Sequence, residues 1–227
     1  MNTLCLKRNA IAAAIGIAGT IFAGSAGAYT WSLDPVVSGQ PPFPSNGLMS
    51  LVAGATTITF DAASLPTGVT YTGGAVTQGF TSGVSAPPQD DTSKYFTVGP
   101  TDGSPGSFNS TFLNRYFGFN LSSPDTYNSL EFLRGGNVLI SYTGTTLGQV
   151  MGFPADGVQT TNRYLNVYAD NAGEYFDQVR FSSTRNAFET DNHAFIAVPE
   201  PETYAMMRAG LGLMGFIARR RKQNAVL

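Results

Sequence analysis

The chain has 227 residues, enough for a well-packed core, and a formal net charge of −2. The charge is uneven, because residues 29–198 hold 13 acidic and 6 basic side chains, a net charge of −7. An acidic domain repels phosphate backbones, so nucleic acid is disfavoured as a partner. The only cysteine, Cys5, excludes a disulfide framework, and stability must therefore come from a packed core.

The first 28 residues have the parts of a secretory signal peptide. Lys7 and Arg8 precede an uncharged, largely apolar run from Ala10 to Phe22. Ala26 and Ala28 then supply small residues at the specificity positions of a signal-peptidase site. We predict an N-terminal signal helix over residues 1–28 that signal peptidase removes. A buried helix or a membrane anchor is the alternative, but the apolar run is short for a membrane span.

From residue 29 to about residue 106, short strand-like stretches alternate with loops rich in Gly, Pro, Ser and Thr. Three stretches combine β-branched and aromatic residues between turn residues: TTITF (56–60), GVTYTG (68–73) and KYFTV (94–98). This region contains no convincing helical stripe. We therefore predict brief strands joined by loops.

The second half of the chain has clearer strand patterns. In NSLEFLRGGNVLISYTG (128–144), apolar side chains alternate on both sides of Gly135 and Gly136, which predicts a β-hairpin. The same alternation recurs in RYLNVYA, YFDQVRFSS and HAFIAV. Over residues 29–198 we predict an all-β domain, a two-sheet antiparallel β-sandwich that is jelly-roll-like. A large twisted barrel is the alternative.

Catalytic signatures are sparse. His193 is the only histidine, the chain has no Gly-x-Ser-x-Gly, and the position of His193 beside a final strand favours a surface residue. Two carboxylates would suffice for a glycosidase, yet spacing selects no pair among the 13 acids. We predict that the protein is not an enzyme, with a matrix-remodelling glycosidase as the alternative.

Acidic and amide side chains cluster in ADNAGEYFD (169–177) and FETDN (188–192). Their oxygens are hard ligands of the kind that Ca²⁺ prefers, although such segments also form ordinary turns. The candidate calcium ligands are Asp170, Asp177, Glu189 and Asp191. We expect any such ion to stabilise the fold, and we predict no other cofactor.

The carboxyl end has three parts in a fixed order: Pro199-Glu200-Pro201, an apolar run over 204–218, and the cations Arg219, Arg220, Arg221 and Lys222. Together, over residues 199–227, they resemble the PEP-CTERM sorting signal of exported proteins of Gram-negative bacteria. The resemblance implies recognition of the Pro-Glu-Pro segment by exosortase, a membrane-embedded processing protein. It also implies a mature protein at the cell surface or in the extracellular matrix, associated with exopolysaccharide or biofilm.

Segments of the domain, including SPDTYNSLEFLRGG and FDQVRFSSTRNAFETDN, also resemble β-rich PEP-CTERM surface proteins. In those relatives a Gly-Ser pair commonly precedes the Asp-x-Tyr-Asn element, whereas this chain has Ser122-Ser123-Pro124. The departure puts any role of that loop in question.

The predicted C-terminal apolar helix is short. Its 15 residues span about 22 Å, against roughly 30 Å of hydrocarbon, and Arg208 interrupts it. The cations that follow would stay cytoplasmic by the positive-inside rule. We expect a precursor held transiently in the inner membrane, and a structural or exopolysaccharide-associated, non-catalytic mature protein. A permanently membrane-anchored sugar-binding module is the alternative.

Overall fold

The fold is taken from a computed structural model that describes residues 29–34, 43–158, 161–199, 207, 209–211 and 213–214. Within the described part of residues 29–199 the chain forms eleven strands and one helix. Their order is β1 (Tyr29–Leu33), β2 (Thr56–Ile58), β3 (Val69–Thr72), β4 (Ala75–Gln78), β5 (Lys94–Val98), β6 (Gly106–Leu121), β7 (Asn128–Arg134), β8 (Asn137–Thr143), α1 (Gly144–Met151), β9 (Arg163–Ala169), β10 (Phe176–Ser183) and β11 (Phe188–Ala197). The all-β prediction is confirmed.

Hydrogen bonds join all eleven strands into one antiparallel sheet, where two separate sheets were predicted. The path β4-β5-β11-β6-β10-β7-β8 is open, with β1, β2, β3 and β9 attached beside it. The long strand β6 joins two arms. Its first half pairs with β3 and β10, and its second half pairs with β9 and β11. A jelly-roll connectivity stays a prediction.

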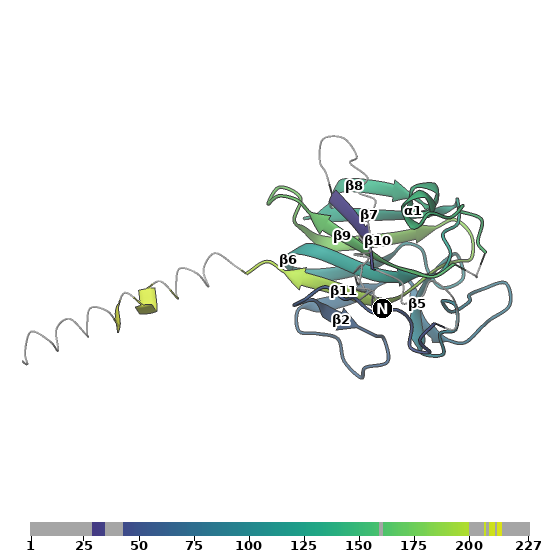
Figure 1. The fold of residues 1–227 in the computed structure, drawn as a ribbon, viewed down its shortest axis with the longest axis horizontal. Coiled ribbons are helices and arrows are strands. Elements are labelled where there is room, and N and C mark those ends of the chain that lie inside the picture. The colour runs from purple at the N-terminus through teal and green to yellow at the C-terminus, as the bar shows by residue number, and fades with distance from the viewer. Residues whose placement is uncertain are drawn as a thin grey trace, which may run out of the picture.

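The two arms of this sheet face each other around one aromatic core. Trp31 on β1 meets Tyr142 on β8 edge to face, with ring centroids 4.8 Å apart. Tyr29 on β1 lies 5.0 Å from Phe132 on β7. In Figure 1, β7 and β8 lie at the top of the domain, β2 and β11 at the bottom, and β6 between them. The folded sheet thereby buries most of the aromatic side chains.

The hairpin of β7 and β8 forms as predicted, with Gly135 and Gly136 at positive φ in the turn. Helix α1, which follows β8, was not predicted. Thr143 caps it, because its Oγ1 accepts a hydrogen bond from the Thr146 N–H at 3.2 Å. Gly152 ends the helix in the left-handed conformation. Leu147 is buried and joins the core.

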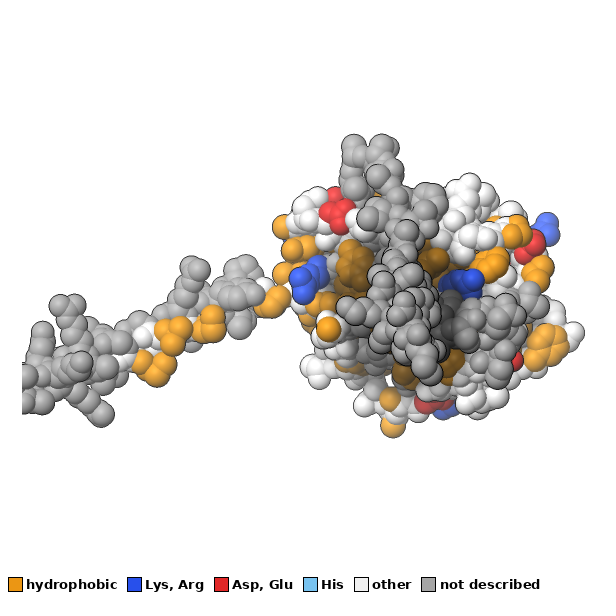
Figure 2. Space-filling view, in the orientation of Figure 1, with side chains coloured by type: hydrophobic (Ala, Val, Ile, Leu, Met, Phe, Trp, Pro, Cys, Tyr) orange, Lys and Arg blue, Asp and Glu red, His pale blue; other side chains and the backbone are white. Residues whose placement is uncertain are grey.

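The outer surface carries few charged side chains. On the face shown in Figure 2, the described acidic and basic side chains are scattered singly or as adjacent pairs of opposite charge and form no single large patch. Arg180 and Glu131 on the neighbouring strands β10 and β7 form an ion pair at 3.0 Å.

Candidate functional site

Strands β6 and β11 present two different faces, since successive side chains of a strand point to opposite sides. On the core face, Phe117, Phe119 and Leu121 of β6 are fully buried in the aromatic cluster. On the opposite face, Asn120 lies directly across from Asp191 of β11. Cross-strand neighbours share a face, so the amide and the carboxylate lie on the same side of the sheet.

His193 lies on the core face and is fully buried. Its Nδ1 lies 2.7 Å from the Tyr71 hydroxyl, and its Nε2 lies 2.8 Å from the Thr190 hydroxyl. Burial lowers the pKa of His193 to about 3, so the ring is neutral. The prediction of a surface histidine is therefore wrong. A register shift between Asp191 and Ala194 changes the alternation, and Asn192 there adopts φ 50°.

On the opposite face, Asp191 is fully buried beside Asp91, which comes from the loop before β5. Ser93 links the two, because its hydroxyl donates to Asp91 and lies 3.5 Å from Asp191 Oδ2. Burial raises the pKa of Asp191 to about 10, and the adjacent Asp91 carboxyl contributes to the rise. Two buried carboxyl groups therefore lie side by side, and neither is paired with a basic side chain among the described residues.

Two amides complete this group. Both polar atoms of Asn120 lack a hydrogen-bond partner among the described residues, although its side chain is fully buried. The amide nitrogen of Asn192 donates to the Asn46 and Leu48 carbonyls, at 2.6 and 3.0 Å. This leaves Asn192 Oδ1 without a described partner. We call Asp91, Asn120, Asp191 and Asn192 the polar cluster.

Gly47 covers the polar cluster, and its position shows how closely the side chains converge. A Cβ on Gly47 would lie 2.9 Å from Asn120 Nδ2, 2.9 Å from Asp91 Oδ2 and 2.8 Å from Asn192 Nδ2. Three residues that are far apart in the chain therefore meet at one point. Gly47 itself adopts φ +70°, which a residue with a side chain rarely adopts.

Further buried polar groups lie next in the chain to members of the polar cluster or are bonded to such neighbours. Asn162, just before β9, donates to the Gln89 carbonyl at 3.4 Å, and the Gln89 N–H donates to Ser122 Oγ at 3.3 Å. Within the part of the chain described, Gln89 Oε1 and Asn162 Oδ1 have no hydrogen-bond partner. Carboxylate and amide oxygens of this kind bind hard cations or hydrogen-bond donors.

Of the four predicted calcium ligands, the structure brings only Asp191 into this cluster. Asp170 is exposed and accepts a hydrogen bond from Thr30, whereas Asp177 accepts from the Gly135 N–H in the β7–β8 turn. Glu189 is buried and accepts from the Ala86 N–H at 2.9 Å. No three His, Cys, Asp or Glu side chains of the described residues gather into a metal-binding group. Asp91 and Asn120 lie outside the two predicted segments, and Asn192 lies in the second segment but was not a predicted ligand.

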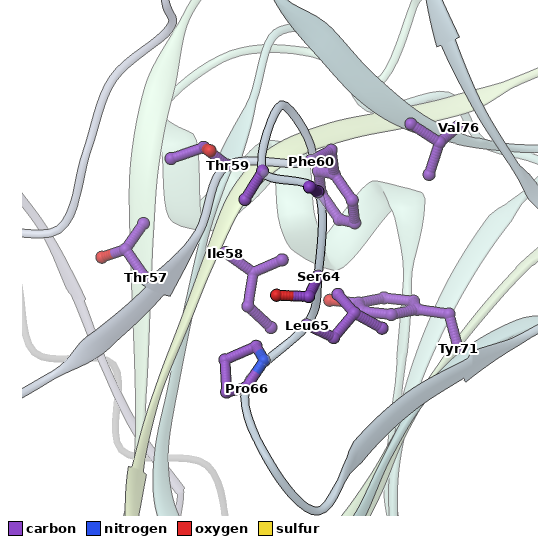
Figure 3. A pocket seen from close by; sticks show the side chains of 11 residues that line it. Thr57, Ile58, Thr59, Phe60, Ser64, Leu65, Pro66, Tyr71 and Val76 are labelled. Atoms are coloured by element: carbon purple, nitrogen blue, oxygen red, sulfur yellow. The ribbon is translucent and has the colours of Figure 1, made fainter.

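A separate pocket of about 530 Å³ opens beside the loop that follows β2. Figure 3 shows Ile58, Phe60, Leu65 and Pro66 around it, with the Tyr71 ring at one side. Phe60 adopts φ 60°, a strained conformation for an aromatic residue. The Tyr71 hydroxyl is bonded to His193, so the polar group nearest the core is already engaged. The pocket is suited to apolar contacts.

A pair of more accessible carboxylates lies elsewhere, where Asp125 and Asp156 form an isolated antiparallel bridge. Asp156 is exposed, and Asp125 is half-buried. Burial raises the pKa of Asp125, and Asp156 adds to the rise. Asp125 lies in the SPDTYN loop that joins β6 to β7.

The described domain ends where the sorting segment begins. The Val198 N–H donates to the Leu113 carbonyl at 2.7 Å, and the exposed Pro199 follows. Residues 207, 209–211 and 213–214 are helical and exposed. Among the described residues, no helix has the length and apolar character needed to cross a membrane. The remaining predicted sorting and cleavage residues lie outside the described residues: Ala26, Ala28, Glu200, Pro201, Arg219, Arg220, Arg221 and Lys222.

Comparison with known proteins identifies the carboxyl end. Residues 197–222 match the PEP-CTERM protein-sorting motif. The chain therefore carries an exosortase-dependent sorting signal, and this signal supports export and processing by exosortase on the way to the cell surface. No curated protein matches the chain.

Proposed function

We propose that the mature protein is a non-catalytic component of the cell surface or extracellular matrix, structural or exopolysaccharide-associated. The observation that carries this proposal is the sorting motif over residues 197–222, which begins where the last strand ends. Pro199 is exposed directly after β11, and proline cannot extend the pairing of a strand. A membrane-embedded processing protein can therefore reach the segment without unfolding the domain.

Burial of three candidate bases among the described residues, His193, Asp191 and Glu189, favours the non-catalytic function. Burial raises the pKa of Glu189 to about 7, but its carboxylate accepts a hydrogen bond from the Ala86 N–H inside the domain. The ring of His193 is neutral, and both of its nitrogens are within hydrogen-bond distance of hydroxyl groups. The adjacent acids Asp91 and Asp191 are buried under Gly47 and its loop. Polysaccharide would reach neither group without opening the fold.

An association with polysaccharide would use exposed rings and the apolar pocket. Phe80 is 71% exposed, in contrast to the many buried aromatic residues of the domain. Aromatic faces stack on the apolar faces of sugars, and the pocket adds the exposed apolar side chains of Leu65 and Val76. A polysaccharide chain is therefore the ligand class proposed for this surface.

Cell fractionation with mass measurement of the mature chain tests the sorting proposal. A variant with Glu200→Ala and Pro201→Ala should fold and be exported, yet remain as a precursor in the inner membrane. Substitution of Arg219, Arg220 and Arg221 should have a different result: the precursor should be held less firmly in the inner membrane, because the cytoplasmic cations are lost. If the Glu200/Pro201 variant reaches the surface with the wild-type carboxyl terminus, the proposal that exosortase recognises this segment is wrong.

A second experiment separates a matrix component from a glycosidase. The purified protein is incubated with exopolysaccharide from the producing cells, and both binding and release of reducing ends are measured. We expect saturable binding without turnover, weakened by Phe80→Ala. Release of reducing ends that is abolished by Asp125→Asn or Asp156→Asn would establish the glycosidase instead, because these are the accessible paired carboxylates.

A further inference from the structure

The polar cluster contains two acids that no described basic residue neutralises. Asp191 is 0% exposed and Asp91 is 4% exposed, and one carboxylate oxygen of each has no hydrogen-bond partner among the described residues. Folded proteins pair nearly all of their buried polar groups, and like charges at close range disfavour each other. Two such carboxylates are stabilised when they share a cation.

Asn120 provides an independent indication of a ligand. Its side chain is 0% exposed, and neither the oxygen nor the nitrogen of its amide has a partner among the residues described. The amide is aimed into the cluster, since it lies opposite Asp191 and converges with Asp91 at the Gly47 position. An amide without a partner can turn its oxygen toward an ion at no loss of hydrogen bonds.

We propose that Asp91, Asp191 and Asn120 form a Ca²⁺ site, with Asn192 Oδ1 as a fourth ligand. The two carboxylates balance the charge of a divalent cation. All four ligands are hard oxygens, which suit Ca²⁺ and not the nitrogen and sulfur preferences of Zn²⁺. Ca²⁺ also tolerates irregular geometry, whereas Mg²⁺ demands a regular octahedron and retains most of its water.

The ion would hold two loops against the sheet. Asp91 lies in the loop before β5, and Asn192, at the register shift of β11, is bonded to the loop around Gly47. A cation bound to Asp91, Asp191 and Asn120 would connect these loops to the neighbouring strands β6 and β11. Extracellular modules bind Ca²⁺ with dissociation constants of about 10⁻⁴ to 10⁻³ M. We expect this site to fall in that range.

Thermal unfolding of the purified protein, in EGTA and in Ca²⁺, is the first test. At a hundredfold excess of Ca²⁺ over the dissociation constant, the melting temperature should rise by about 5–10 °C. Asp191→Asn keeps the shape of the side chain but replaces the carboxyl group with an amide, which cannot supply a negative charge to a cation. Because the carboxyl group has no cationic partner when the ion is absent, the variant should melt no lower than the wild type in EGTA. It should not respond to Ca²⁺.

Asp170→Asn is the matched control, since it removes a carboxylate that lies outside the cluster and is bonded to Thr30. This variant should respond to Ca²⁺ as the wild type does. If Asp191→Asn lowers the melting temperature equally in EGTA and in Ca²⁺, the carboxylate is only structural and the proposal fails. A wild-type melting temperature that is the same under both conditions would also overturn it.

Terbium luminescence gives a readout that does not depend on stability. The Tyr164 hydroxyl donates to the Asn192 carbonyl at 2.7 Å, so this ring lies beside the cluster and can sensitise a bound Tb³⁺. We expect one Tb³⁺ per chain, displaced by millimolar Ca²⁺ and not by equal Mg²⁺. Asp91→Asn should reduce Tb³⁺ affinity at least tenfold. Luminescence that is lost with Asp170→Asn but retained with Asp91→Asn would place the site elsewhere.

Discussion

The two faces of strands β6 and β11 are equally buried but differ in how their polar groups are satisfied. On the core face, both nitrogens of His193 have hydroxyl partners, and the surrounding side chains are aromatic. On the opposite face, Asn120 and Asp191 retain polar atoms without described partners. Burial alone therefore does not distinguish the two faces of these strands. Hydrogen bonding of His193 and of Asn120 does, because an unpaired buried group costs free energy that a bound partner would offset.

The largest expected effect is on the core face. Phe117 is fully buried, and its ring lies 5.3 Å from His193 and 6.2 Å from Phe181. Phe117→Ala should lower the free energy of unfolding by about 3–5 kcal/mol, measured by urea denaturation. Phe80→Ala is the control, because its ring is exposed and its removal should change stability by less than about 0.5 kcal/mol. Similar losses for both variants would contradict this account of the core.

The second prediction concerns the pH dependence that His193 produces. Its pKa is about 3 in the folded protein, below its usual value of 6.5. As the pH falls below 6.5, the unfolded chain gains a proton that the folded chain cannot accept, so stability decreases until about pH 3. Each pH unit in this window should lower the folding equilibrium constant by up to about tenfold.

Urea unfolding of the wild type and of His193→Gln, at pH values from 6.5 to 5, isolates this contribution. Carboxylates contribute equally to both proteins, and the difference in slope belongs to the histidine. Equal slopes would mean that the ring takes up a proton in the folded state. Water or another polar group would then have to reach His193 on the core face, contrary to its aromatic packing.

The third prediction tests how tightly the opposite face is packed. Gly47→Ala would place a methyl group within 3 Å of Asn120, Asn192 and Asp91, in addition to the strain of a positive φ. Gly54→Ala in the same loop carries a similar φ, +80°, but meets nothing within 4 Å. We expect a loss of about 1 kcal/mol for Gly54→Ala and about 2–3 kcal/mol for Gly47→Ala. Equal losses would show that the polar cluster leaves enough space at Gly47 for a methyl group.

Local strand patterns explain how much of the fold could be predicted. The stretch KYFTV forms β5 with the expected bounds, and the hairpin turns at Gly135 and Gly136. Both depend on alternation and turn chemistry within a few residues. Helix α1 was missed, because eight residues are too few to show a clear helical period and its cap, Thr143, also ends a strand. The branching of β6 between two arms depends on distant partners and has no local signal.

The polar cluster was harder to predict, because its residues come from separate segments. Asp191 was identified by residue type, but its partner Asp91 lies 100 positions away, in a loop that resembles any polar turn. Asn120 ends an otherwise aromatic strand pattern, YFGFN, and this polar residue on a buried strand was the available signal. His193 was misplaced because the register shift at Asn192 cannot be read from the sequence. Residue chemistry was thus predictable, and convergence in space was not.

The smallest expected effect is the loss of an amide that has no partner. Asn120 and Asn166 are both fully buried asparagines, but Asn166 donates to Asp34 at 2.8 Å and accepts from the Tyr116 hydroxyl at 2.6 Å. In EGTA, Asn166→Ala should cost about 1–3 kcal/mol, because it leaves two bonded groups unpaired, whereas Asn120→Ala should cost less than about 1 kcal/mol. In saturating Ca²⁺ the difference between the two losses of unfolding free energy should become smaller or change sign, since only Asn120→Ala removes a ligand. Urea denaturation of both variants under the two conditions measures this difference. If Asn120→Ala is as costly as Asn166→Ala in EGTA, the Asn120 amide is already satisfied without an ion, and the contrast between the two faces does not hold.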